Sequence, residues 1–225
     1  MNKEINKPFA ITLDVGSSLA NKTGSWRTFK PTYLKRLPPC NNACPAGENT
    51  QEWLFHAESG DYLQAWKTLT ADNPMPAVMG RVCYHPCENA CNRGQLDSAV
   101  GINSVERFLG DEALKLNWQF DKPAKQSGKR VLVVGAGPSG LSAAYQLYRM
   151  GHQVSIYEAG PYAGGMMRFG IPSYRLPREV LDGEIQRIVN LGVELRLNTK
   201  VDNILETMKE GKFDAILGIG GWIGS

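Results

Sequence analysis

The chain has 225 residues, of which 42% are hydrophobic, so it can bury a core and is not expected to be disordered. Its 25 basic residues nearly balance 22 acidic ones, and the net charge of +3 indicates no general attraction to nucleic acid or membranes. No apolar run reaches the roughly 18 residues of a membrane span, and the N-terminus lacks a signal-peptide layout. We therefore expect a cytoplasmic protein without a membrane span, whose thiols stay reduced.

Residues 1–37 are polar and show no regular hydrophobic period, so they are predicted to form an extended basic arm. Basic side chains clearly outnumber acidic ones in this segment. The arm is interpreted either as a solvated tail or as a segment that wraps a partner subunit.

Residues 38–121 carry the hydrophobic pattern of short helices and hold every cysteine of the chain. Two helices are expected in the first half, with Asn49 or Thr50 capping one and Asp61 capping the other. A third amphipathic helix has a predicted apolar side made of Ile102, Val105, Phe108 and Leu109.

The five cysteines are an odd number in a chain expected to be reduced, which argues against a disulfide framework. They form two groups, the first with Cys40 and Cys44 and the second with Cys83, Cys87 and Cys91. The pattern favours metal or cluster ligation.

Residues 122–129 are polar, with Pro, Ser and Gly, and are predicted to be a linker to a second domain at 130–225. That domain opens with a continuous apolar run at 131–134, as expected for a strand buried on both faces. A G-x-G-x-x-G turn follows, formed by Gly135, Gly137 and Gly140. These glycines permit a tight turn, close approach of a pyrophosphate and close helix packing.

A helix from Pro138 onward would point its free N–H groups at phosphates. A second strand then ends at Glu158, whose carboxylate can accept hydrogen bonds from a ribose. This order indicates a dinucleotide-binding fold, although NAD and FAD sites share these residues. Residues 164–177 are too rich in glycine and proline for a helix, and Arg175 there is either a phosphate or flavin contact or an ordinary surface arginine. A helix is expected from about Pro177, and strands at 192–201 and 213–221.

Several motifs together resemble a known family: PPCNNACP, GRVCYHPCENAC, GINSVERF, VLVVGAGPSGLSAA, YEAGPYAGGMMRFGIPSYRLP and FDAILGIGG. From about residue 38 to 225, the chain is similar to the small subunit of glutamate synthase and to the N-terminal half of dihydropyrimidine dehydrogenase. The resemblance implies an α+β multidomain chain. A helical iron–sulfur domain of the α-helical ferredoxin type would precede a partial Rossmann-like α/β domain that binds FAD.

The resemblance also implies the residues that contact FAD. They are Gly135, Gly137, Pro138, Ser139 and Gly140 at the pyrophosphate, Glu158 at the adenosine ribose, Gly164, Gly165 and Met166 beside the flavin, Arg175 in the RLP motif, Val201 at the adenine and Gly220 near the pyrophosphate.

The family pattern holds two [4Fe–4S] clusters and includes a C-x2-C pair upstream of Cys40, where this chain has no cysteine. The comparison therefore implies one cluster rather than two. Its ligands would be Cys44, Cys83 and Cys87. Cys40 and Cys91 would remain from the second site, which has lost its other two ligands.

The fourth ligand is open among Cys40, Cys91 and Glu106, which stands where dihydropyrimidine dehydrogenase has a glutamine ligand. Structural zinc is the alternative to a cluster, because C-x2–4-C pairs include the spacing found here. His85 could then join the ligands.

The implied function is an electron-transfer subunit that relays electrons between NAD(P)H and a partner oxidoreductase through FAD and the cluster. No catalytic acid, base or nucleophile is expected, because the flavin carries the chemistry. Family members continue into an NAD(P) domain beyond the motifs found here. We therefore expect NAD(P)H to act through a domain on another chain or through a larger oxidoreductase subunit.

Two other functions remain as alternatives. The first is a non-catalytic adaptor or truncated module that docks a partner through the cysteine-rich domain and the arm. The second is a simple NAD-dependent dehydrogenase, which would need a substrate domain and a catalytic base after the dinucleotide fold.

Overall fold

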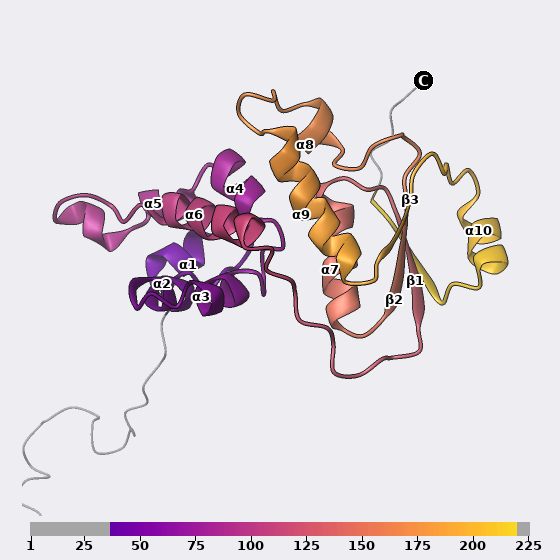
Figure 1. Cartoon of the computed structure of the whole chain (residues 1–225), viewed down its shortest axis with the longest axis horizontal. Helices are drawn as coiled ribbons and strands as arrows, with labels where there is room; N and C mark the ends of the chain where they lie inside the picture. Colours follow the sequence, from indigo (N-terminus) through magenta and orange to yellow (C-terminus); the bar gives the residue numbers. More distant parts are fainter. Residues whose placement is uncertain (1–36, 220–225) are drawn as a thin grey trace, which may run out of the picture. The chain divides into compact units, whose positions relative to one another are not determined.

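The computed structural model of the chain describes residues 37–219, so nearly all of the predicted basic arm and Gly220 lie outside the described part (Figure 1). In chain order the elements are α1 (Pro39–Ala43), α2 (Thr50–Glu58), α3 (Tyr62–Leu69), α4 (Pro76–Val82), α5 (Pro86–Asn89), the 3-10 helix η2 (Asn92–Gln95), α6 (Ile102–Lys115), β1 (Arg130–Val134), α7 (Pro138–Arg149), β2 (Gln153–Tyr157), α8 (Met166–Phe169), α9 (Arg178–Asn190), β3 (Glu194–Arg196), α10 (Ile204–Gly211) and β4 (Ala215–Gly218). Helices therefore precede a Rossmann-like α/β unit, which confirms the predicted fold class.

Helices α2 and α3 begin close to the predicted capping residues. Asn49 precedes α2, but its side chain makes no capping hydrogen bond, whereas Asp61 precedes α3 and its side chain accepts the backbone N–H of Gln64 at 3.1 Å. Trp53, Leu69 and Leu109 from α2, α3 and α6 are fully buried against one another. These apolar side chains hold the three helices together.

Two glycines allow α4 and α6 to pack backbone against backbone. A Cβ at Gly80 would lie 2.5 Å from the Cα of Arg107, and one at Gly110 would lie 2.3 Å from the backbone nitrogen of Ala77. No heavier residue fits at either position without separating the helices. Because Cys83 directly follows α4 and Glu106 lies on α6, this close packing sets the distance between two residues of the candidate site.

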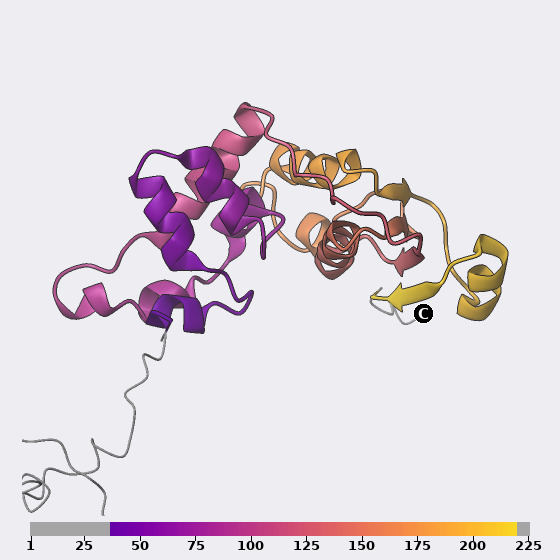
Figure 2. The same cartoon turned by 90° about the horizontal axis from the view of Figure 1, so that it is seen from below.

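The α/β unit is a parallel sheet in the order β3-β2-β1-β4, with Val131 of β1 paired to Val154 of β2 and to Ala215 of β4. In both views, α7 and α9 lie on one side of the sheet and α10 lies on the other (Figure 1 and Figure 2). In this order, the carboxyl end of β1 leads through the glycine turn directly into α7. No helix among residues 37–219 has the length and apolar character that crossing a membrane requires.

The segment at 164–177 contains a one-turn helix, so the expectation that it is free of helix is wrong. Residues Met166–Phe169 form α8 directly after Gly164 and Gly165, which both have positive φ values of 115° and 49°. These two conformations, which favour glycine, turn the chain so that a single helical turn fits before Pro172.

A buried ion pair ties α9 to the helical part. Glu184 is fully buried, accepts the backbone N–H of Ala77 at 2.8 Å and pairs with Arg187 at 2.5 Å. The Arg187 guanidinium lies over the rings of Trp66 and Phe120. Burial raises the pKa of Glu184 to about 7. The contact of α9 with α4 therefore depends on a charge pair enclosed by aromatic rings.

We predict that Arg187→Met destabilises the chain by about 3–5 kcal/mol at alkaline pH, because an ionised Glu184 is then buried without its cation. In both proteins the contribution of Glu184 to stability falls as the pH rises from the pKa of this group in the unfolded chain, 4.5, toward its raised pKa in the folded chain. In the variant the folded pKa lies higher still, so the stability deficit should grow above about pH 7. Urea unfolding of both proteins between pH 5 and 9 measures this difference.

The matched control is Lys67→Met, which removes the more exposed ion pair with Asp121. Exposed pairs contribute little to stability, so this variant should lose much less and show no growing deficit above pH 7. Equal losses in the two variants would contradict the assignment of Arg187 to a buried pair.

Candidate functional site

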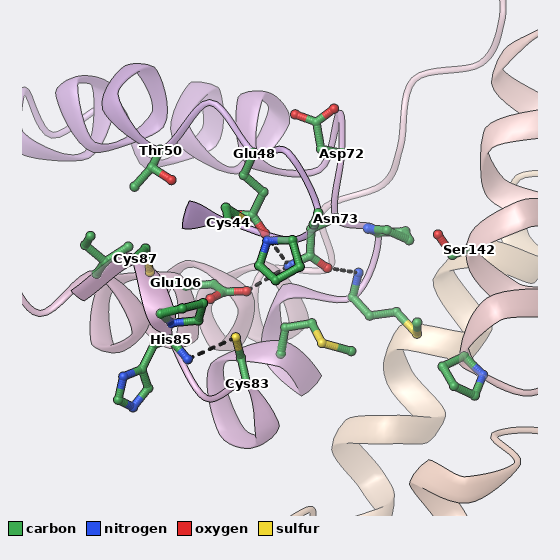
Figure 3. A pocket seen from close by; sticks show the side chains of 18 of the residues that line it. Cys44, Glu48, Thr50, Asp72, Asn73, Cys83, His85, Cys87, Glu106 and Ser142 are labelled. Carbon is green, nitrogen blue, oxygen red and sulfur yellow. Dashed lines mark hydrogen bonds between the residues drawn. The ribbon is translucent and has the colours of Figure 1, made fainter. Parts of the chain in front are cut away.

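The helical part and the start of α7 together line a cavity of about 390 Å³ that gathers three of the five cysteines (Figure 3). Cys44, Cys83 and Cys87 line it, together with the buried acids Glu48 and Glu106. The three thiols come from different segments: Cys44 follows α1, Cys83 follows α4 and Cys87 lies in α5. The cavity thus brings together the three cysteines that the resemblance implied as cluster ligands.

The turn between Cys83 and Cys87 is held in a left-handed conformation. His85 has φ 41° and ψ 57°, and its backbone N–H donates to the Cys83 sulfur at 3.3 Å. Burial is the main cause that raises the pKa of Cys87 to about 12, and burial also raises the pKa of Cys44. These thiols ionise readily only when a cation enters the cavity to stabilise the thiolates.

Cys40 and Cys91 do not line this cavity. Cys40 lies in α1 and packs against the apolar cluster that contains Trp53. Cys91 precedes η2, and backbone hydrogen bonds, the largest from Val100, lower its pKa. All five cysteines are free thiols.

An asparagine links the two buried acids of the cavity. The side-chain nitrogen of Asn73 donates to Glu48 at 3.0 Å and to Glu106 at 2.7 Å (Figure 3). Burial is the main cause that raises the pKa of Glu48 to about 7 and that of Glu106 to about 8. Sequence reasoning identified Glu106 but missed Glu48 and Asn73, because no motif marks them.

The donor set fits a cluster better than a single ion. Among residues 37–219, no group of three His, Cys, Asp or Glu side chains is arranged to hold one metal ion. In a four-iron cluster each ligand binds a different iron, so the ligands surround a space instead of meeting at one point. Three thiols and a carboxylate around a cavity match that requirement. His85, the predicted extra zinc ligand, has its ring nitrogen Nδ1 3.3 Å from Glu88.

A second hollow, a groove of about 590 Å³, lies at the carboxyl end of β1 and β2. Of the residues that the resemblance implied for FAD, those that line the groove are Gly135, Gly137, Pro138, Ser139, Gly140, Glu158, Gly165, Met166 and Val201. Tyr157, Thr199 and Lys200 also line it and were missed, because the strand and loop patterns do not show which side chains face a ligand. The groove runs from the glycine turn to the loop at Val201.

Glycines beside the groove let backbone segments approach one another closely. A Cβ at Gly165 would lie 2.8 Å from the Cα of Gly137, and one at Gly140 would lie 1.9 Å from the carbonyl oxygen of Gly135. Glu158 accepts the backbone N–H groups of Ala136 at 2.7 Å and Gly160 at 2.9 Å, one on each oxygen. Each carboxylate oxygen can still accept one more hydrogen bond, such as one from a ribose hydroxyl.

Two other residues implied for FAD lie away from the groove lining. The N–H of Gly164 donates to the carbonyl of Ala136 at 2.8 Å. Gly164 therefore holds the turn before Gly165 against the glycine turn and does not line the groove. Arg175 is exposed, and its Nε donates to the carbonyl of Arg81 in α4 at 3.3 Å. The structure therefore does not bring Arg175 to the groove.

The cavity and the groove share a wall. Pro138 and Ser139, in the first turn of α7, line both spaces, and Ser142 one turn later lines the cavity. The same helix begins directly after the glycine turn, so its N-terminus is the boundary between the cysteines and the dinucleotide groove.

Comparisons with known proteins assign both parts of the chain. Residues 35–118 match the family of dihydropyrimidine dehydrogenase domain II, 4Fe-4S cluster, and residues 133–194 match the NAD(P)-binding Rossmann-like domain. The chain is a homologue of the glutamate synthase small subunit. It joins an iron–sulfur domain of the dihydropyrimidine dehydrogenase type to a Rossmann-like domain, which confirms the resemblance seen in the sequence.

Three curated relatives show the range of this homology. The chain is 40% identical to the NADP(+)-dependent formate dehydrogenase subunit beta of Moorella thermoacetica, covering 77% of this chain and 27% of the relative. It is 35% identical to the NAD-dependent dihydropyrimidine dehydrogenase subunit PreT of Salmonella typhimurium, over 80% of this chain and 44% of the relative. It is 37% identical to the glutamate synthase [NADPH] small chain of Mycobacterium tuberculosis, over 82% of this chain and 38% of the relative. The chain thus spans less than half the length of each of these oxidoreductase subunits.

Proposed function

We propose that this glutamate synthase small-subunit homologue is an electron-transfer subunit that holds FAD in the groove and one [4Fe–4S] cluster in the cavity. It would relay electrons between NAD(P)H and a partner oxidoreductase. FAD supplies hydride acceptance and one-electron release when bound, and a cluster supplies one-electron exchange. The chain's own residues bind the two groups, orient them and separate them from water.

The observation that carries this proposal is the wall shared by the cavity and the groove. Pro138 and Ser139 line both, so two redox groups bound there would be separated only by the first turn of α7. The two residues of this shared wall, Pro138 and Ser139, carry no charged side chain. An adaptor that only docks a partner would not need two adjoining cofactor-sized spaces.

FAD is proposed for the groove because of its volume of about 590 Å³ and the donors that line it. The backbone N–H groups at the start of α7 point to the position of a pyrophosphate, as helix N-termini do. Glu158 would accept from the adenosine ribose, Val201 would contact the adenine, and Gly165 and Met166 would lie beside the flavin. Gly164 would hold the turn that places them.

For the cluster we propose Cys44, Cys83, Cys87 and Glu106 as the four ligands. Glu106 is preferred over Cys40 and Cys91 because it lines the cavity and they do not. The carboxylate is an oxygen donor among three sulfurs, which makes one iron chemically different from the others.

We further propose that the partner is a larger oxidoreductase subunit or a chain that carries an NAD(P) domain. Three relatives named above are subunits or chains of enzymes that use NAD or NADP by name. The setting is the cytoplasm, where five free thiols stay reduced.

Anaerobic purification followed by iron, sulfide and flavin analysis tests the proposal. We expect about four irons and four sulfides per chain, one FAD per chain, and broad absorbance in the visible range. Dithionite should bleach both chromophores. Adding a partner that carries an NAD(P) domain should raise the rate at which NADH or NADPH is oxidised with a dye acceptor.

Two results would overturn the proposal. Zinc in place of iron after anaerobic purification would assign the cavity to a structural metal. A colourless, iron-free and flavin-free chain that still binds a partner stoichiometrically, even after reconstitution with iron, sulfide and FAD, would assign the chain to the adaptor function.

A further inference from the structure

We propose that Asn73 is a positioning residue that holds the Glu106 carboxylate in place as the oxygen ligand of the cluster. The inference rests on the proposed function, since it concerns the proposed cluster ligand. Asn73 does not touch the metal itself. It acts through its two hydrogen bonds to the buried acids of the cavity, Glu48 and Glu106 (Figure 3).

The orientation of the Asn73 amide is fixed by three neighbours. Its nitrogen donates one proton to Glu48 at 3.0 Å and the other to Glu106 at 2.7 Å. Its oxygen accepts the backbone N–H of Met75 at 3.1 Å, just before α4 begins. Turning the amide over would place its oxygen against two carboxylates and its nitrogen against an N–H donor, so only one orientation satisfies all three contacts.

This fixed amide divides the two oxygens of Glu106 between two tasks. The short hydrogen bond from Asn73 goes to Oε1. Oε2 receives only a contact from Asn103 at 3.4 Å, beyond the usual length of an N–H···O bond. Oε2 is therefore the oxygen that remains available to an iron, while Oε1 is held by the protein.

Burial makes the arrangement rigid. Asn73, Glu48 and Glu106 are 5%, 7% and 6% exposed, so water does not replace a lost hydrogen bond easily. Glu106 also lies on α6, the helix whose backbone is pressed against α4 at Gly80 and Gly110. Partners of this kind that orient a metal ligand typically change metal affinity by about 10–100-fold when removed.

The test uses the reconstituted full chain and the variants Asn73→Ala, Glu106→Ala and the double variant. We expect Asn73→Ala to release its most labile iron to a chelator about 10–100-fold faster, and its reduced electron paramagnetic resonance spectrum to move toward that of Glu106→Ala. The double variant should behave as Glu106→Ala does, because both changes act on one ligand. Asn73→Gln, which keeps the amide, should recover part of the wild-type spectrum.

Thr70→Val is the matched control, since it removes a buried hydrogen bond to the carbonyl of Trp66 in the same helical part but does not line the cavity. It should lower the unfolding temperature and leave the spectrum and the iron release unchanged. If Asn73→Ala behaves like Thr70→Val, or if its effect adds fully to that of Glu106→Ala, the inference is wrong. Iron-free wild-type protein after reconstitution would instead refute the proposed function.

Discussion

Replacing Cys44 with alanine should leave the chain without its iron–sulfur cluster, whereas Cys40→Ala should leave the iron content at the wild-type level. Cys44 lines the cavity with Cys83 and Cys87, whereas Cys40 does not line it and packs against the apolar cluster that contains Trp53. Removing one of three thiolates leaves too few sulfur ligands for a stable four-iron cluster. Iron and sulfide per chain, measured after anaerobic reconstitution, give the answer directly.

Two further variants sharpen this experiment. Cys91→Ala should behave like Cys40→Ala, because neither residue lines the cavity. Alanine is preferred to serine at position 44, since a serine oxygen could itself bind iron. If Cys40→Ala lost its iron and Cys44→Ala kept it, the proposal that Cys44 is a cluster ligand and Cys40 is not would be wrong.

Gly137→Val should weaken flavin binding by roughly 100-fold or more without unfolding the chain. No atom lies within 3.4 Å of a Cβ built at Gly137; the nearest is the Cα of Gly165 at 3.9 Å. The added side chain would occupy the groove where the pyrophosphate is proposed to bind. We expect the binding free energy of FAD to fall by about 3 kcal/mol or more, which corresponds to roughly 100-fold weaker binding. A titration followed by flavin fluorescence measures this change. The iron content should not change, because the cysteines lie on the other side of the α7 turn.

Gly140→Ala is the contrasting variant. A Cβ there would lie 1.9 Å from the carbonyl oxygen of Gly135, so the turn and α7 must separate. We expect a loss of stability of about 3 kcal/mol, at the upper end for an overpacked site, and a lower unfolding temperature even without FAD. Equal unfolding temperatures for the two flavin-free variants would contradict the distinct roles of these glycines.

Local patterns allowed much of the fold to be predicted from sequence. A strand, a turn, a helix and a second strand were predicted in this order from the apolar run before Gly135, the spaced glycines and the acid at Glu158. The structure has each of them. Asp61 caps α3 as expected. Such features depend on residues close together in the chain, so the sequence displays them directly.

Features that depend on distant segments were harder to predict. Phe108 was expected on the buried side of its helix but is 43% exposed, and it contacts Tyr62 edge to face at the surface. Helical periodicity gives the relative positions of side chains and not which neighbours cover them. The contact of Glu48 and Glu106 through Asn73 joins a loop, α6 and a turn before α4, and no spacing in the sequence reveals it.

The glycine crossing of α4 and α6 has a consequence for how the chain matures. Gly80 and Gly110 bring the two helices into contact through backbone atoms. We therefore expect helix packing to hold the segments that carry Cys83 and Glu106 in place, unlike small metal-dependent domains that are unfolded until their ion binds. We expect the amides of both helices to resist hydrogen exchange in the iron-free chain, so that cluster insertion is a late step into a compartment already built.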